Sequence, residues 1–169
     1  MTNEIVLEIE PLSETQVVID SIRKPVDITK EYKVVVLYSE NQNRYLPIWV
    51  GPVEAEVLVS ELTNIPHQTT TAFIEQINLS GKPIKISITD LINQVYKASI
   101  TVEKSGNEIH LPMRPSDVLA VAVRLDLPII VSNAVMNEAA KSPPVTGIMA
   151  GINNAFNALK TKFRIRPTK

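Results

Sequence analysis

The chain has 169 residues, of which 44% are hydrophobic and 21% are charged. These fractions are typical of a globular protein, and the length predicts one domain with room for a short extension. The 17 Lys and Arg residues nearly balance the 18 Asp and Glu residues, giving a net charge of −1. This balance excludes a strongly basic protein held to phosphate by bulk charge, so any nucleic-acid site needs a local basic patch.

The absence of cysteine excludes disulfides, thiolate nucleophiles and Cys-ligated zinc. The first ten residues carry three glutamates and have neither the basic start nor the apolar run of an export signal. No stretch has the roughly 18 consecutive apolar residues that a membrane helix needs. We therefore expect a cytoplasmic protein that has no membrane partner.

The first third of the chain predicts a set of β-strands. A loose alternation suggests one strand at 5–9, and β-branched or aromatic residues mark two more at 16–22 and 32–38. Turn residues at 41–43 then lead into a returning strand over 44–50. Because Pro47 cannot donate to a ladder, we expect that strand to lie at a sheet edge or to contain a bulge.

Gly51-Pro52 ends this strand and opens a helix over 53–62, because proline suits the first helical position. A polar loop over 63–70 leads to a second helix at about 71–79, which ends at Ser80-Gly81. Three segments with a period near two follow, and they predict an antiparallel meander with a hairpin turn at Lys104–Asn107: 84–90, 94–102 and 108–112.

Arg114-Pro115-Ser116-Asp117 introduces a helix over 118–125 that is apolar nearly all round and therefore buried. A short strand at 128–131 and a short helix at 133–141 follow. The fold class that we expect is α+β, with a mixed, largely antiparallel sheet and packed helices. The predicted division is an N-terminal extension over 1–15, a domain over 16–142, and a C-terminal amphipathic helical extension over 143–169, whose apolar residues recur at helical spacing between 146 and 163.

Three segments resemble signatures of the bifunctional nuclease (BFN) family: RYLPIWVGPVEAEVL at 44–58, ITDL at 88–91, and MRPSDVLAVAVRLDLPIIVS at 113–132. The upstream VIDSIR at 18–23 is similar to the usual family start, so the resemblance covers about 16–141. It implies an α+β domain that commonly self-associates and a family named for degrading both DNA and RNA. We therefore expect a homo-oligomer with DNA or RNA as its substrate.

One family motif is changed in this chain. The family usually carries Thr-His-Asp-Leu at the start of its second helix, and alignment through Gly81 and ITDL places that tetrad on 69–72. Thr70 and Thr71 therefore replace the family's His and Asp. Loss of a general base or a metal ligand typically costs orders of magnitude in rate. Two hypotheses remain open, namely a nuclease and a non-catalytic homo-oligomeric binding module of the same fold.

Phosphodiester hydrolysis needs a bound metal or a general base, together with cations for the developing charge. The candidate catalytic residues are Glu54, Asp117 and Arg114, with Arg114 as the phosphate contact. A divalent metal such as magnesium is the expected cofactor, because magnesium prefers carboxylates plus water. Glu54 and Glu56 splay by about 200° on a helix, so at most one of them serves a given site. The structural alternatives are first-turn charges for both glutamates and helix capping by Ser116 or Asp117.

Further polar and aromatic residues have both a functional and a structural interpretation. Asp90 is a third site carboxylate or a strand-end turn residue. His67 substitutes for the missing family histidine or lies solvated in a loop, whereas His110 is a packed or surface residue of a strand. Arg44 is a second candidate cation. Trp49 is a base-stacking platform, or a residue of the core or of a subunit interface.

Overall fold

A computed structural model describes residues 14–24, 29 and 31–143. In this part of the chain one sheet contains seven strands in the order β3-β2-β1-β7-β4-β5-β6. Every neighbouring pair is antiparallel except β4 and β7, so the predicted mixed and largely antiparallel sheet is confirmed. The strands are β1 (Glu14–Arg23), β2 (Lys33–Ser39), β3 (Arg44–Val50), β4 (Lys82–Ile92), β5 (Val95–Lys104), β6 (Asn107–Met113) and β7 (Ile129–Ser132).

Short turns with left-handed residues close the three hairpins. Asn43 has φ 48° between β2 and β3, and Asn93 and Gln94 have φ 51° and 64° between β4 and β5. Ser105 and Gly106, with φ 55° and 79°, form the turn between β5 and β6. Two successive residues at positive φ give a turn whose twist matches that of the flanking strands, which explains why the predicted meander forms.

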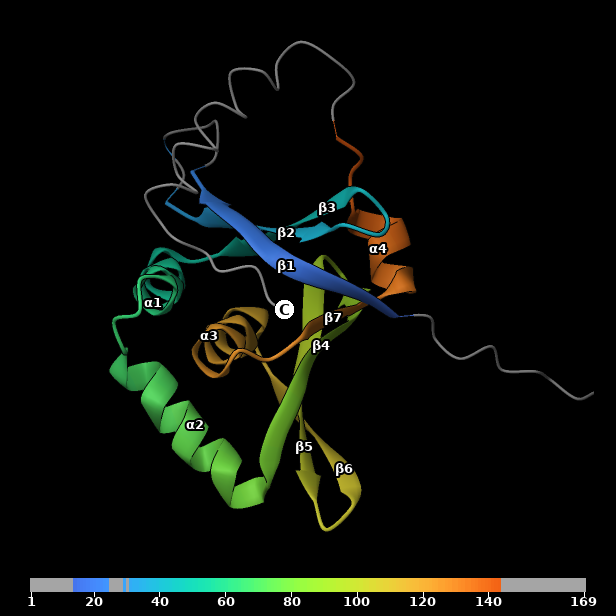
Figure 1. The fold of residues 1–169 in the computed structure, drawn as a ribbon. Coiled ribbons are helices and arrows are strands. Elements are labelled where there is room, and N and C mark those ends of the chain that lie inside the picture. The colour runs from blue at the N-terminus through green and yellow to red at the C-terminus, as the bar shows by residue number, and fades with distance from the viewer. Residues whose placement is uncertain (1–13, 25–28, 30, 144–169) are drawn as a thin grey trace, which may run out of the picture.

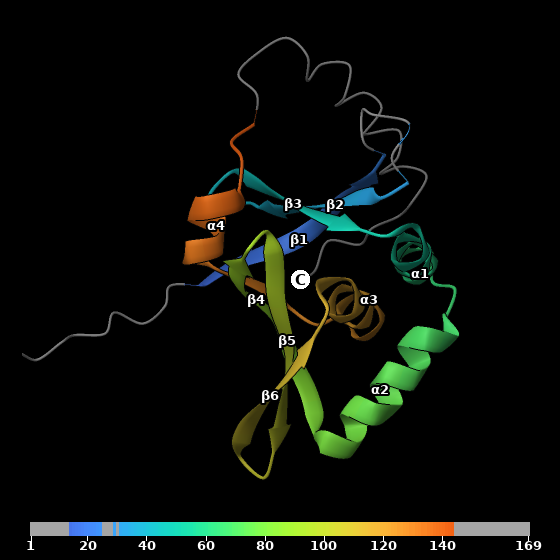
Figure 2. The same cartoon turned by 180° about the vertical axis from the view of Figure 1, so that it is seen from behind.

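Helix α3 lies at the centre of the helical layer. The helices are α1 (Pro52–Leu62), α2 (Gln68–Ser80), α3 (Pro115–Leu125) and α4 (Asn133–Ala139). Figures 1 and 2 show α3 against β4 and β5, with α1 and α2 on its far side, while α4 lies near β3 at the other end of the sheet. Val118 to Ala122 of α3 are all buried, so this helix is apolar nearly all round because it has neighbours nearly all round.

Most predicted elements are confirmed within a few residues. β3 is an edge strand, as Pro47 predicts. α2 begins at Gln68, three residues before the predicted start, because His67 caps it. The predicted strand at 5–9 and the predicted helix between 146 and 163 lie outside the described residues. None of the helices within the described ranges is both long enough and apolar enough to cross a membrane.

A single backbone position at the end of α3 gives a test of this fold. Asp126 lies in the left-handed region with φ 54°, and its N–H donates to the carbonyl of Ala122. This conformation costs a residue with a Cβ about 1–2 kcal/mol, whereas glycine adopts it freely. We expect Asp126→Gly to raise the free energy of unfolding by about 0.5–1 kcal/mol in urea denaturation. Asp126→Ala keeps the Cβ and is the control, and stabilisation by alanine as well would contradict the explanation.

Candidate functional site

Helices α1 and α3 begin side by side and share the same N-terminal chemistry. Each has a proline at its start, and their N-cap residues are Gly51 and Arg114. Neither N-terminus is capped by a side chain, so the predicted capping of α3 by Ser116 or Asp117 is wrong. Two helix N-termini at one place concentrate backbone N–H groups and the positive ends of two helix dipoles.

Arg114 joins the two helices through a cluster of charged hydrogen bonds. Its Nε and Nη2 donate to Oδ2 and Oδ1 of Asp117 over 2.8 and 3.1 Å. Its Nη1 donates to Oε1 of Glu54 over 3.0 Å. The structure therefore brings together Glu54, Arg114 and Asp117, which the sequence analysis selected from two segments 60 residues apart. Glu56, by contrast, is exposed on another side of α1, so only one of the two glutamates belongs to this cluster.

The guanidinium of Arg114 remains accessible while its acidic partners are shielded. The exposed fractions of the side chains are 64% for Arg114, 28% for Glu54 and 13% for Asp117. Hydrogen bonding and charge from Asp117, and secondarily the charge of Glu54, raise the pKa of Arg114, although burial opposes this. The three bonds use one hydrogen on each nitrogen, so Nη1 and Nη2 each keep a second N–H that can bind an anion.

Gly51 makes room for the carboxylate of Glu54. A Cβ placed on Gly51 would collide with Oε2 of Glu54. The backbone of Gly51 is ordinary, with φ −67° and ψ 166°, so left-handed geometry is not what requires glycine here. The missing side chain instead allows Glu54 to fold back over the helix start towards Arg114.

The cluster does not fit the magnesium ion that the sequence analysis expected. Both carboxylates point at the guanidinium, which stands where a metal would have to lie between them. Among the described residues no group of three His, Asp or Glu side chains could hold a metal ion. A metal would have to displace Arg114 from Glu54 or Asp117, and the donors as placed form a site for an anion.

Two further candidates lie apart from this cluster. Asp90 is exposed on β4 opposite Lys97 of β5, and none of the ion pairs in the described part of the chain joins it to Arg114. Arg44 donates to Oδ1 of Asn137 and to the carbonyl of Ala140, so it ties β3 to α4.

The two histidines also have structural partners. Nδ1 of His67 accepts the N–H of Thr69 over 3.2 Å, which makes His67 the N-cap of α2. His67 lies partly exposed at the end of the loop, so it is a loop residue that also caps the helix. His110 is exposed on β6, and its Nδ1 lies 3.0 Å from the hydroxyl of the buried Thr101. Neither histidine lies within the Arg114 cluster.

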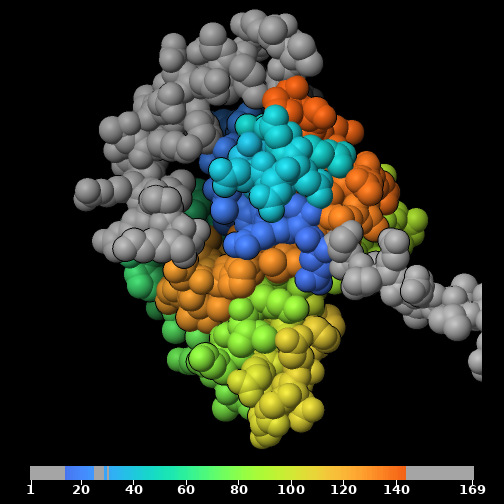
Figure 3. Space-filling model, turned by 45° about the vertical axis from the view of Figure 1, so that its right-hand side comes forward, coloured from blue at the N-terminus to red at the C-terminus, as the bar shows by residue number. Residues whose placement is uncertain are grey.

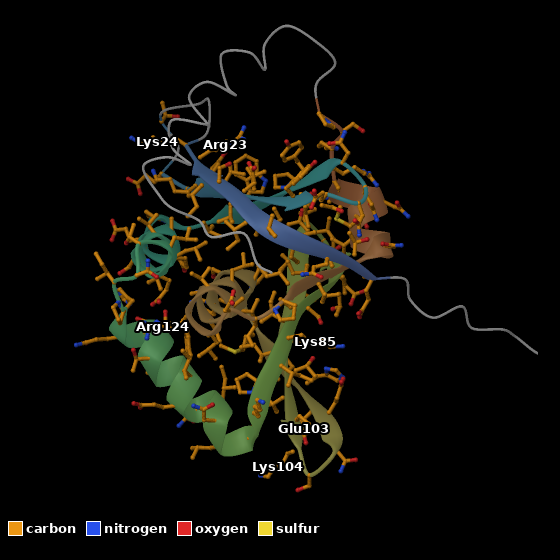
Figure 4. The ribbon with its side chains drawn as sticks, in the orientation of Figure 1. Arg23, Lys24, Lys85, Glu103, Lys104 and Arg124 are labelled. Carbon is orange, nitrogen blue, oxygen red and sulfur yellow. The ribbon has the colours of Figure 1, made fainter. Side chains whose placement is uncertain are left out.

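A second ion pair, which the sequence analysis missed, lies at the other ends of α1 and α3. Nε and Nη2 of Arg124 donate to Oε2 and Oε1 of Glu61 over 2.5 and 2.6 Å. The Glu61 side chain is only 2% exposed, and its Oε1 also accepts the N–H of His67 over 2.9 Å. Figure 4 shows Arg124 where α1, α2 and α3 come together. The signal in the sequence is a shared spacing, because Glu61 follows Glu54 by seven residues and Arg124 follows Asp117 by seven.

The position of the changed family motif belongs to this second cluster. Nη1 of Arg124 lies 3.4 Å from the hydroxyl of Thr71, and its Nη2 lies 3.4 Å from the carbonyl of His67. Thr70 is completely buried. Glu61 lies seven residues beyond Glu54, about 10 Å of helix, and Arg124 lies ten residues beyond Arg114, about 15 Å, so the motif lies well along the helix pair from the first cluster.

Comparison with known proteins matches the part of the chain that contains the three family-like segments. The bifunctional nuclease domain matches residues 35–144. An uncharacterized protein of Mycobacterium tuberculosis is 31% identical over 118 residues, which cover 68% of this chain and 70% of that protein. Bifunctional nuclease 1 of rice, Oryza sativa, is 26% identical over 116 residues, which cover 64% of this chain and 35% of the rice protein.

The buried pair gives a stability prediction. Burial raises the pKa of Glu61, but the hydrogen bonds from Arg124 and from the N–H of His67 outweigh it and leave this pKa below its usual value. A lowered folded-state pKa means that the ionised carboxylate stabilises the fold above the usual pKa of about 4.3, and that this is lost as pH falls through the folded value. Glu61→Gln should therefore lower the free energy of unfolding by about 3 kcal/mol at pH 7.

The difference between Glu61→Gln and the native chain should shrink as the pH falls below about 4, because Glu61 then becomes neutral in the native chain too. Urea denaturation between pH 3 and pH 7 measures this. Glu56→Gln on the exposed side of α1 is the matched control and should change stability by less than about 0.5 kcal/mol. A difference between Glu61→Gln and native protein that is independent of pH would contradict the role given to the charge.

Proposed function

Because the chain belongs to the bifunctional nuclease domain family, we propose that it is a nuclease that binds its phosphodiester substrate at Arg114. The observation that carries this proposal is the exposed guanidinium of Arg114, held between Glu54 and Asp117 where α1 and α3 both begin. The proposal extends to a homo-oligomer that acts on DNA or RNA in the cytoplasm, as the sequence analysis predicts.

Each residue of the cluster has a distinct task in this proposal. The outward N–H groups of Arg114 and the positive ends of two helix dipoles bind a phosphate and stabilise the charge that develops on it. Asp117 holds Arg114 through two bonds and so acts as a positioning residue. Glu54 is the more exposed carboxylate and is held by one bond, which suits it to take a proton from the attacking water.

The second candidate is a non-catalytic homo-oligomeric binding module. Two observations favour it, namely the replacement of the family's His and Asp by Thr70 and Thr71, and the contact that Arg114 already makes with both carboxylates of the cluster. In that case Arg114 still binds phosphate, but Glu54 does not activate water.

A cleavage assay separates the two candidates. Purified protein is incubated with single-stranded and supercoiled DNA and with RNA, in magnesium, in manganese and in chelator. We expect cleavage that Arg114→Ala and Asp117→Ala reduce by at least about 100-fold, whether or not metal is present, because transition-state charge stabilisation and its orientation are lost. Glu56→Gln, on the same helix but outside the cluster, should leave the rate unchanged.

Equal cleavage by the native chain and by Asp117→Ala would point to a contaminating nuclease and would sink the proposal. Phosphodiester binding that depends on Arg114, without turnover on any of these substrates, would establish the binding module in its place.

Gly51 offers a second test that leaves all the charges in place. Gly51→Ala places a methyl group against Oε2 of Glu54, so the carboxylate must shift and its bond to Arg114 should weaken. Because alanine accepts this backbone conformation, the free energy of unfolding should change by less than about 1 kcal/mol. The cleavage rate should fall at least about tenfold, to a value near that of Glu54→Gln. A full rate in Gly51→Ala together with a lost rate in Glu54→Gln would show that Glu54 acts from another position.

A further inference from the structure

We propose that the outer face of β1, β2 and β3 binds unpaired bases of a single-stranded nucleic acid through Trp49. This inference rests on the proposed nuclease function and names its substrate class. Figure 3 shows parts of β1 (blue) and of β2–β3 (cyan) at the surface beside α4 (orange).

Trp49 points away from the core. The inward residues of β3, Leu46, Ile48 and Val50, are buried, so the alternate residues Tyr45, Pro47 and Trp49 face outwards. Trp49 is 57% exposed, and the interpretation of it as a core residue is therefore wrong. Its ring meets that of Tyr32 edge to face, with the centroids 4.8 Å apart. An aromatic ring held this way from one side presents a fixed surface on which a planar ligand can stack.

A cation shares the row that contains Trp49. Val34 of β2 is opposite Trp49 on one side and Arg23 of β1 on the other, so the three side chains lie in one line across the outer face. Two strand spacings separate Arg23 from Trp49, or about 10 Å. Arg23 is 40% exposed and is held by Asp20 and Ser21, and Lys24 follows it at the end of β1 (Figure 4). Val34, which is 9% exposed, forms an apolar floor between the cation and the aromatic ring.

This arrangement complements a single-stranded nucleic acid. Every base has a flat face that stacks on an aromatic ring, and the phosphates need nearby cations. A duplex keeps its bases stacked inside and cannot offer one to Trp49. With a net charge of −1, the chain needs a local basic patch to bind nucleic acid, because bulk charge cannot hold it. The cations at the end of β1 supply such a patch.

The outer face and the Arg114 cluster are close enough for one strand to reach both. Trp49 and Glu54 are five residues apart, and five residues of chain span at most about 18 Å. β3 is an edge strand of the described sheet, so none of the seven described strands lies between Trp49 and the start of α1 on that side. A base stacked on Trp49 would thus be a few nucleotides from a phosphate bound at Arg114.

The chain contains one tryptophan, so its fluorescence reports on this position alone. The full-length Glu54→Gln variant, whose cleavage should be slowed while Arg114 stays in place, is titrated with a labelled ten-nucleotide thymidylate strand and with a duplex of the same length. We expect saturable quenching of Trp49 by the single strand and at least about tenfold weaker binding of the duplex. In anisotropy measurements Trp49→Ala should weaken single-strand binding at least about tenfold, the loss of roughly one base stack, while Trp49→Phe should restore most of it.

Two controls separate base stacking from nonspecific hydrophobic binding and from electrostatic binding. Leu79→Ala removes an exposed hydrophobic residue, 73% exposed on α2, and should leave binding unchanged. Arg23→Ala should reduce the slope of log affinity against log salt by about 0.7, the value for one phosphate contact to a single strand.

Equal affinity for the single strand in the Trp49→Ala variant and in the protein that keeps Trp49 would overturn the inference. So would Trp49 emission that is already shielded from acrylamide before any strand is added. Shielding at every protein concentration would mean that the chain covers this face itself, and shielding that grows with concentration would mean that a second copy does. Trp49-dependent binding without cleavage by the native chain would overturn only the nuclease proposal. Cleavage that ignores Trp49 would overturn only the stacking subsite.

Discussion

The parallel contact of α1 and α3 is the constraint on which the candidate site depends. Ion pairs tie these helices together near both ends, with Glu54 on Arg114 at the start and Glu61 on Arg124 at the finish. Seven residues make close to two helical turns, so Glu54 and Glu61 fall on one face of α1, and Asp117 and Arg124 fall on one face of α3. The pair of Glu61 with Arg124 fixes the position of α1 along α3. The two rigid helices then place Glu54 next to Arg114.

The two ion pairs have opposite consequences because one is buried and the other is exposed. Glu61 is enclosed by three helices, so its charge must stay paired and its loss is costly. The Arg114 pairs are open to water on the side of the guanidinium, and ion pairs in contact with water contribute only about 0–1 kcal/mol. Stability therefore does not explain why a glycine is kept clear for Glu54 and why a guanidinium projects over two helix starts. The proposed binding of an anion would explain both features.

The sequence predicts the elements well where local chemistry dictates them. Turn residues fix the hairpins, Gly51-Pro52 starts α1, and the apolar run after Arg114 marks a buried helix. The start of α2 is missed because capping by His67 is visible only in three dimensions. The pairing of Glu61 with Arg124 needs the knowledge that α1 and α3 run parallel. The exposure of Trp49 cannot be predicted from the sequence, because β3 carries apolar residues on both of its faces.

The changed motif and the Arg114 cluster occupy different places, which bears on whether the changed motif implies inactivity. Thr71 faces Arg124, and Thr70 is buried, so both belong to the far ends of α1 and α3. A carboxylate at position 71 would have Arg124 as its nearest cation, and in this chain Glu61 already supplies a carboxylate to that guanidinium. The replacement of His and Asp by threonine thus alters the end of the helices where Glu61 pairs with Arg124. It leaves Glu54, Arg114 and Asp117 unchanged. The proposed binding of phosphate at Arg114 therefore does not depend on positions 70 and 71, because the hydrogen bonds of Arg114 run to Glu54 and Asp117.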